Sequence, residues 1–526
     1  MPISAAKESL TAFEQWNETI SSLLDTAYNN SVVWLLMITL LGVGIWLTIR
    51  TSGMQVRMFT HMLKVITRSR GGSEGGVSSF QAFAIGLADR VGTGSITGVA
   101  LAVVAGGPGS VFWMWVVALV GMATAFVEAT LAQLFKVRNG DGTFRGGPAF
   151  YIQRGLGSRT WGIVFAVLLI FAYGFSFEMI QANSISQLAN SDYLGFPVWA
   201  TALILVLLTL PLVVGGVRKI AKFSEYLAPA MALLYVAMGI LVIVLNYDRI
   251  PFVFREIFMG AFGQSNTYMP PAVAGAGGAF IAAITTGTKR GLFTNEAGMG
   301  SAPNAAAIAT VRHPATQGMI QALGVFVDTM LVCTSTAFII LMSAPFWDKQ
   351  NHVDGAVLTM DSIVTSLGSN STTQTVVFVF VMVMMVCFGY STILGNYTYA
   401  ETNYKFIVGV DRSALPLKLL VIASTAIGAI LPLKSVWSIA DWATALMALV
   451  NLVALIFLGK WAVGALRDYR AQMKTNDPAE PVFCSRNNQY LPGELPTRVW
   501  TTPGGFDPTW NTSSATSEKC YVRKGK

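Results

Sequence analysis

Long apolar runs constrain this chain more than any other feature. Runs of about 20 mostly apolar residues, the length of a helix that crosses a lipid bilayer, recur from about residue 30 to about residue 465. Hydrophobic residues make up 53% of the chain and charged residues only 12%, which leaves too little polar surface for a soluble globule of 526 residues. The sequence therefore predicts an all-α, multi-pass membrane protein.

The apolar runs predict about eleven transmembrane helices. They form a membrane domain over residues 30–470, preceded by an extracytoplasmic segment at 1–29. The polar, proline-rich residues 471–526 are expected to form a flexible cytoplasmic tail. The predicted helices cover residues 30–49, 79–103, 110–135, 161–187, 197–216, 224–246, 273–296, 317–345, 373–404, 416–432 and 437–460.

Basic residues alternate between the connections of these helices. One set of alternate connections contains 21 Lys and Arg residues, and the other set, counted with the N-terminal 29 residues, contains five. Because cytoplasmic connections carry an excess of positive charge, we expect the N-terminus outside and the C-terminus in the cytoplasm of a cell (inner) membrane. The dispersal of the net charge of +8 argues against a nucleic-acid partner. The basic set comprises 50–70, 136–160, 217–223, 297–316, 405–418 and 460–474.

Two glycine-rich polar clusters interrupt the apolar runs, at residues 90–98 and 294–301. They lie five spans apart. Because five is odd, the second group of five helices enters the membrane from the side opposite to the first, which is the pattern of inverted repeats in secondary transporters. The pattern predicts repeats at about 79–246 and 273–460, with the helix at 30–49 outside them.

Each cluster is expected to break its helix near the middle of the bilayer, at 91–95 and at 293–298. A break frees backbone N–H and C=O groups that cannot face lipid, so they are expected to line a solute or ion site. The alternative is that the glycines only allow helices to pack closely. Two such clusters at matching repeat positions favour the solute site.

The first break is suited to a zwitterion. A half-helix beginning after Gly94 points free N–H groups and its positive dipole end at a carboxylate, and Gly92, Thr93 and Gly94 allow a close backbone approach. Carbonyl groups near Phe293 and Thr294, at the second break, can accept hydrogen bonds from an ammonium group. The Phe293 ring can shield the site from water.

Other polar side chains within the spans are candidate ligands. The amide of Gln181 can donate and accept, although a buried amide can instead bond a neighbouring helix. The hydroxyl groups of Ser391 and Thr392 can face a substrate and a sodium ion, with backbone carbonyls of the first break, such as that of Val91, as further ion ligands. The alternative is that both hydroxyls bond their own helix.

Ionisable residues inside spans are functional candidates. Arg90 and Glu296 lie at the two breaks, and their pairing is a possible gate. The alternative is that each bonds exposed backbone. The full set is Asp89, Arg90, Glu128, Glu178, Lys289, Arg290, Glu296 and Asp328.

Several motifs resemble one transporter family, the alanine or glycine:cation symporters, also called sodium:alanine symporters. The strongest is Gly-Gly-Pro-Gly-Ser-Val-Phe-Trp-Met-Trp at 106–115. The resemblance covers the membrane region from about residue 30 to 460. Supporting motifs are Arg-Val-Gly-Thr-Gly at 90–94, Phe-Arg-Gly-Gly-Pro-Ala at 144–149, Gln-Ala-Asn at 181–183 and Asn-Glu-Ala-Gly-Met-Gly-Ser-Ala-Pro-Asn at 295–304.

The resemblance implies a LeuT-type fold of five plus five helices with one extra N-terminal helix. It also implies uptake of alanine or glycine with sodium as the coupling ion, and contact between Gln181 and the substrate. Two positions depart from the family: Ser95 replaces a frequent Asn, and Asn396, four residues after Thr392, replaces a Trp found in some members beside the expected substrate site.

Two other functions remain open from the sequence. One is a proton-coupled carrier that uses Glu296 or another buried carboxylate, and the other is a channel or a receptor derived from a transporter. No enzyme is expected, because the three histidines lie far apart and no zinc spacing, P-loop or Gly-x-Ser-x-Gly motif occurs. No cofactor is expected apart from the sodium ion.

Overall fold

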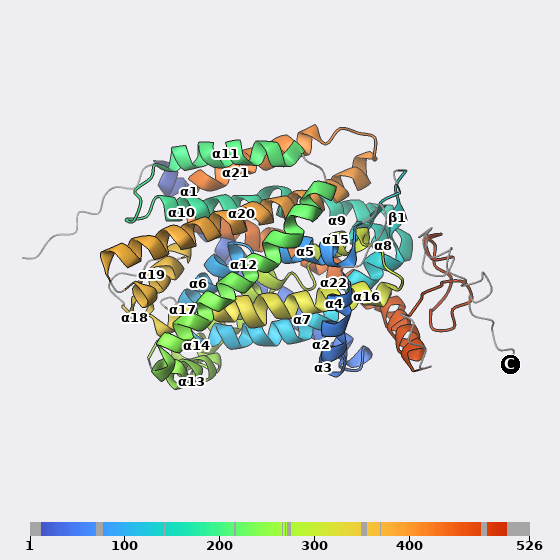
Figure 1. The fold of residues 1–526 in the computed structure, drawn as a ribbon, viewed down its shortest axis with the longest axis horizontal. Helices are drawn as coiled ribbons and strands as arrows, with labels where there is room; N and C mark the ends of the chain where they lie inside the picture. The colour runs from blue at the N-terminus through green and yellow to red at the C-terminus, as the bar shows by residue number, and fades with distance from the viewer. Residues whose placement is uncertain are drawn as a thin grey trace, which may run out of the picture.

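The computed structural model is almost entirely helical (Figure 1). It describes residues 12–69, 77–140, 142–214, 217–265, 267–268, 270, 275–348, 355–368, 370–474 and 481–501.

The N-terminal half contains the helix that lies outside the predicted repeats, α2, and the first broken helix, α5–α6. A short antiparallel hairpin pairs Val137 with Arg145 and Arg138 with Phe144. The elements are α1 (Ala12–Ala27), η1 (Tyr28–Val32), α2 (Val33–Arg50), α3 (Met54–Arg57), α4 (Phe59–Arg68), α5 (Ser79–Arg90), α6 (Gly94–Gly106), α7 (Gly109–Leu134), β1 (Val137–Arg138), β2 (Phe144–Arg145), α8 (Pro148–Gly155), α9 (Arg159–Phe171), η2 (Ala172–Ser176), α10 (Phe177–Ala189), α11 (Val198–Val214), α12 (Val217–Leu245), η3 (Tyr247–Arg249) and α13 (Ile250–Ala261).

The C-terminal half begins with the second broken helix and ends with the longest helix. Its elements are α14 (Gly275–Asn295), α15 (Ala302–Ile308), α16 (Pro314–Val325), η4 (Phe326–Cys333), α17 (Thr334–Met342), α18 (Ala344–Trp347), α19 (Gly355–Leu367), α20 (Ser371–Val408), α21 (Leu415–Ile430) and α22 (Leu433–Met473).

The predicted fold class, an all-α multi-pass membrane protein, is confirmed. Within the described residues, eight helices are long and apolar enough to cross a membrane. Three shorter apolar helices lie at 198–210, 355–367 and 415–430. Helices lie over all eleven predicted ranges, but the count of eleven spans is not confirmed, because α11 and α21 are short and α14 is less apolar.

Helix α7 is the centre of the packing around the two broken helices. It packs against α6, α14, α15 and α16, which come from both halves of the chain. From Gly121 to Leu134 every side chain of α7 is buried. This burial fixes α7 between the two breaks, so polar side chains on α7 can reach the unwound backbone.

The two ends of the described chain pack on opposite parts of α22. Helix α1 packs against its first turns, where the Trp442 indole donates to Leu24 O (3.0 Å). Residues 481–501, called the C-terminal segment below, lie at the end of the bundle near α8 and the hairpin (Figure 1). The sequence predicted a flexible tail over 471–526 and did not predict this packing. Phe483 and Trp500 of the segment are buried.

Candidate functional site

The first break lies where the sequence predicted it. Helix α5 ends at Arg90 and α6 begins at Gly94, so residues 91–93 are unwound. The backbone resumes hydrogen bonding with Ser95 N to Gly92 O (3.2 Å) and Thr97 N to Thr93 O (2.8 Å). The N-terminal turn of α6 therefore begins in the buried interior of the protein.

Gln181 on α10 meets this break directly. Its Oε1 accepts from the backbone N–H of Thr93 (3.2 Å) and from the Thr93 hydroxyl (2.7 Å). Gln181 is 1% exposed. The amide of Gln181 therefore holds the unwound backbone, which joins the predicted residues Gln181 and Thr93 in one site.

Thr392 on α20 lies against the same break. Its hydroxyl donates to Ala88 O (2.9 Å), one of the last carbonyls of α5. A Cβ atom at Gly92 would lie 2.2 Å from Thr392 Oγ1 and 3.3 Å from Gln181 Oε1. Only glycine fits at position 92, because no real Cβ approaches a neighbour at 2.2 Å.

Gly94 is pressed against Phe293 in the same way. A Cβ atom at Gly94 would lie 2.6 Å from Phe293 Cε1. The Phe293 ring stacks on Phe177 of α10 (4.4 Å between ring centroids) and packs at 50° against Trp437 of α22 (4.7 Å). The predicted aromatic cover over the first break is thus a cluster of three rings, and the sequence indicated only Phe293.

The second break begins later than predicted. Helix α14 continues through Phe293 and Thr294 to Asn295, so the unwound residues are 296–301 rather than 293–298. Glu296 adopts a left-handed backbone conformation (φ 59°), and Gly298 and Gly300 also have positive φ angles (99° and 84°). The prediction began the break at Phe293, next to the first polar residue of the cluster, whereas α14 ends where these left-handed residues begin.

Side chains from two other helices hold this second break. Glu128 on α7 accepts from Gly298 N (3.0 Å) and from the Asn451 amide on α22. The Asn451 amide also donates to Gly298 O (2.9 Å), and the Tyr151 hydroxyl donates to Asn451 Oδ1. Buried side chains therefore supply hydrogen-bond partners to the unwound backbone. Such groups need partners inside the protein, because lipid offers none. Of Glu128, Asn451 and Tyr151, only Glu128 was predicted from the sequence as a functional candidate.

A buried carboxylate lies between the two breaks. Asp328, in η4, accepts from the hydroxyls of Ser95 (2.8 Å) and Thr329 (3.0 Å). The Thr294 hydroxyl, which donates to Gly291 O of its own helix (3.2 Å), also interacts with this carboxylate. Asp328 is 0% exposed, and no Lys or Arg among the described residues lies within 4.0 Å of it. We call Asp328, Ser95, Thr294 and Thr329 the Asp328 cluster.

The proposed gate residues lie near each other without a direct ion pair. Arg90 donates to Gln321 O (3.3 Å) and interacts electrostatically with Glu296, but within the described chain no nitrogen of Arg90 lies within 4.0 Å of a Glu296 oxygen. Glu296 accepts from the Ser301 hydroxyl (2.7 Å) and lies against the Asp89 carboxyl group. Both breaks therefore meet in a buried group of charges.

The remaining predicted ligands lie on the same helices but make other contacts. The Ser391 hydroxyl donates to Phe388 O of its own helix (2.9 Å), which is the alternative that the sequence left open. Asn396 is 0% exposed and interacts with the Glu178 carboxyl group. Val91 donates its N–H to Leu87 O (2.8 Å) as the last hydrogen bond of α5.

A second charged group closes the end of the bundle near α1. Asp441 on α22 pairs with Arg290 (2.9 Å) and Lys289 (2.8 Å) of α14. The guanidinium of Arg290 also lies over the Trp437 ring (4.2 Å). These ion pairs lie beyond the aromatic cluster and join α14 to α22.

Comparison of the sequence with known proteins gives matches to one family. The sequence model of the sodium:alanine symporter family matches residues 17–484. The probable sodium/glutamine symporter GlnT of Bacillus subtilis (strain 168) is 41% identical over 86% of this chain and 91% of its own length. The sodium/alanine symporter AgcS of Methanococcus maripaludis is 36% identical over 83% of this chain and 94% of its own length.

Solved structures give a more distant likeness. A mutant of the manganese transporter of Eremococcus coleocola is 13% identical over 75% of this chain and 80% of that chain, with a TM-score of 0.45. A sodium-coupled sialic acid symporter is 13% identical over 84% of this chain and 86% of that chain, with a TM-score of 0.42.

The match of the family model over most of the chain, together with these close relatives, identifies a transporter rather than an enzyme. The chain belongs to the sodium:alanine symporter family.

Proposed function

We propose that this chain imports a small neutral amino acid, alanine or glycine, together with sodium by alternating access. The observation that carries the proposal is the first break, where the absence of a Cβ at Gly92 and Gly94 brings Thr392, Gln181 and Phe293 directly against the unwound backbone. The surrounding side chains are neutral amides, hydroxyls and aromatic rings, which suit a small zwitterion and leave little room for a long side chain.

Each charge of the zwitterion has a partner in this arrangement. The N-terminal turn of α6 presents its positive dipole end to the carboxylate. The last carbonyls of α14, near Phe293 and Thr294, accept from the ammonium group. The three-ring cluster around Phe293 excludes water, which strengthens both interactions in a low dielectric.

We propose two positions for sodium. The first is formed by neutral oxygens of Val91, Ser391 and Thr392. The second is the Asp328 cluster, which offers a buried carboxylate and hydroxyl oxygens without a basic partner in contact. A hard cation is bound by several oxygen ligands, and a carboxylate supplies the negative charge that the first position lacks. Both positions touch the first break, so sodium binding orders it and favours substrate binding.

Transport in a defined membrane tests the proposal. Proteoliposomes containing the purified chain are expected to accumulate labelled alanine and glycine when an inward sodium gradient is imposed, and to lose accumulation when choline replaces sodium. Labelled glutamine and exchange of preloaded alanine are measured in parallel. Equal alanine entry with and without a sodium gradient would contradict symport, and entry without exchange would indicate a channel.

Proton coupling is the second candidate, favoured by one observation. The carboxyl groups of Asp89 and Glu296 are both buried and interact electrostatically, and a second negative charge nearby disfavours ionisation of a buried carboxyl group. We propose under this alternative that the pair carries the proton that transport moves. Under this alternative, a pH gradient at fixed sodium drives alanine uptake, and Glu296→Gln removes that effect.

The proposed orientation can be tested at the β1–β2 hairpin. The excess of basic residues in 136–160 predicts that a cysteine replacing Gly142, an exposed turn residue with φ 84°, faces the cytoplasm. In intact cells with other thiols blocked, it is expected to resist an impermeant thiol reagent and to react only after permeabilisation. Rapid labelling in intact cells would reverse the proposed orientation of both termini.

A further inference from the structure

The C-terminal segment is held by specific contacts rather than by chance packing of a polar tail. Phe483 is 0% exposed and Trp500 is 1% exposed, and their rings meet edge to face (5.5 Å between centroids). Ser485 N and Oγ both donate to Trp500 O (2.8 Å each), which closes residues 481–501 into a loop. The segment is therefore a folded unit with its own apolar centre.

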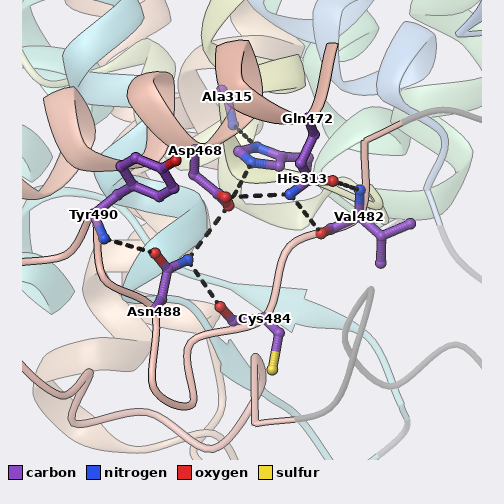
Figure 2. A network of polar contacts seen from close by, with 8 residues as sticks. All are labelled: His313, Ala315, Asp468, Gln472, Val482, Cys484, Asn488 and Tyr490. Atoms are coloured by element: carbon purple, nitrogen blue, oxygen red, sulfur yellow. Dashed lines mark hydrogen bonds and ion pairs between the residues drawn. The ribbon is translucent and has the colours of Figure 1, made fainter. Parts of the chain in front are cut away.

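The first anchor of the segment is a buried carboxylate at the end of α22 (Figure 2). Asp468 accepts from Asn488 of the segment (3.3 Å), from Gln472 (3.3 Å) and from His313 Nε2 (3.3 Å). Burial lowers the pKa of His313, so the ring is neutral at pH 7 and donates through Nε2 while Nδ1 accepts from Ala315 N (3.1 Å). Asp468 thus joins the segment, α22 and the start of α16.

A second anchor lies at the end of α7. The Trp500 indole donates to Gln133 O (2.8 Å), and the Thr497 hydroxyl donates to Leu134 O (3.1 Å). These carbonyls belong to the last turn of α7, where helical partners are missing. The ammonium group of Lys136 lies 5.0 Å from the centroid of the Trp500 ring and donates to Ala309 O (2.9 Å).

A third anchor is the connection between α15 and α16. Phe483 N donates to Arg312 O (3.0 Å), and the Phe483 ring packs edge to face on His313 (5.1 Å). Helix α15 is the second half of the broken helix, so this connection follows the second break directly. The segment therefore contacts the ends of α7, α15–α16 and α22 at one face of the bundle.

We propose that the C-terminal segment is a latch that restrains opening of the transporter at this face. Alternating access proceeds by rocking of one part of a transporter bundle against another, and the segment ties the ends of α7, α15 and α16 to α22. The segment is bound in a closed form, because Gln181 and Phe293 at the candidate site are 1% and 4% exposed. Its residues Asn488, Thr497 and Trp500 lie beyond the family match at 17–484, so this restraint is added to the shared transport domain.

The latch rests on the proposed transport function and is tested by exchange in proteoliposomes. Trp500→Ala and Asn488→Leu each remove an anchor in the full chain. If opening at this face limits exchange, each change is expected to raise the counterflow rate of labelled alanine by about three- to tenfold, the effect of losing one hydrogen bond or a little more. Trp500→Phe keeps a ring near Lys136 but lacks the indole N–H, and an intermediate increase is expected.

Glu494→Gln is the matched control, since Glu494 is an exposed residue of the same segment. Rates are compared per mole of alanine-binding protein, and thermal unfolding is measured for each variant. Lower melting temperatures with unchanged rates per binding-competent molecule would show a purely structural role and overturn the latch, as would slower exchange. If the unmodified chain shows no exchange at all, the proposed transport function fails, and the latch fails with it.

Discussion

Replacing Gly94 by leucine is expected to abolish alanine uptake, with a loss of at least about a hundredfold. Even a Cβ atom at this position would lie 2.6 Å from Phe293, and the Phe293 ring is confined by Phe177 and Trp437. Leucine adds three more carbon atoms, which either displace Phe293 or fill the space beside the first turn of α6. Overpacking of this kind costs about 1–3 kcal/mol or more in a packed interior, and it falls where the substrate carboxylate is proposed to bind.

Initial uptake of labelled alanine is measured at saturating sodium for Gly94→Leu and for Gly42→Leu. Gly42 is the matched control, because it lies on the exposed side of α2 and a Cβ atom there meets no atom within 4 Å. Both variants are expected to insert into the membrane, since leucine is a good helix former. Alanine uptake by Gly94→Leu at the rate of the control would remove the first break from the substrate site.

The fold was largely predictable because its main signals are local. An apolar run of the right length is visible in the sequence wherever the helix packs, so helices lie over every predicted range. The first break was equally visible, since Gly92 lies within it and Gly94 follows it. The second break was misplaced by about three residues, because its start is set by the left-handed conformation of Glu296 and by contacts from Glu128 and Asn451. Composition alone does not record such contacts.

The site was only partly predictable, for a related reason. Gln181 and Thr392 could be selected because polar residues in apolar spans are few, and the structure places both beside Gly92. The Asp328 cluster joins Asp328 to Ser95, 233 positions away in the chain. Each member had an ordinary local explanation on its own helix. Only the folded chain shows that their oxygens converge between the two breaks.

Changing Asp328 to asparagine is expected to weaken sodium dependence more than any change at the neutral position, the sodium position proposed for the oxygens of Val91, Ser391 and Thr392. Asparagine keeps the shape of the side chain but removes its negative charge, and an interaction with a charged group contributes about 1.5–3 kcal/mol. The half-saturating sodium concentration for alanine uptake is therefore expected to rise by roughly tenfold to a hundredfold. Asp248→Asn, at an exposed carboxylate in η3, is the matched control and is expected to leave sodium dependence unchanged.

The neutral position gives the comparison that separates the two sodium sites. Thr392→Val and Ser391→Ala each remove one uncharged hydroxyl ligand, and a neutral interaction of about 0.5–1.5 kcal/mol corresponds to an increase of roughly twofold to tenfold in half-saturating sodium. Thr392→Ser retains the oxygen and is expected to retain most of the sodium dependence. If Asp328→Asn leaves sodium dependence intact while abolishing the response to a pH gradient, Asp328 carries a proton rather than contacting sodium. If it changes neither, Asp328 serves only to hold Ser95 and Thr329, and sodium binding must be assigned to the oxygens of Val91, Ser391 and Thr392 alone.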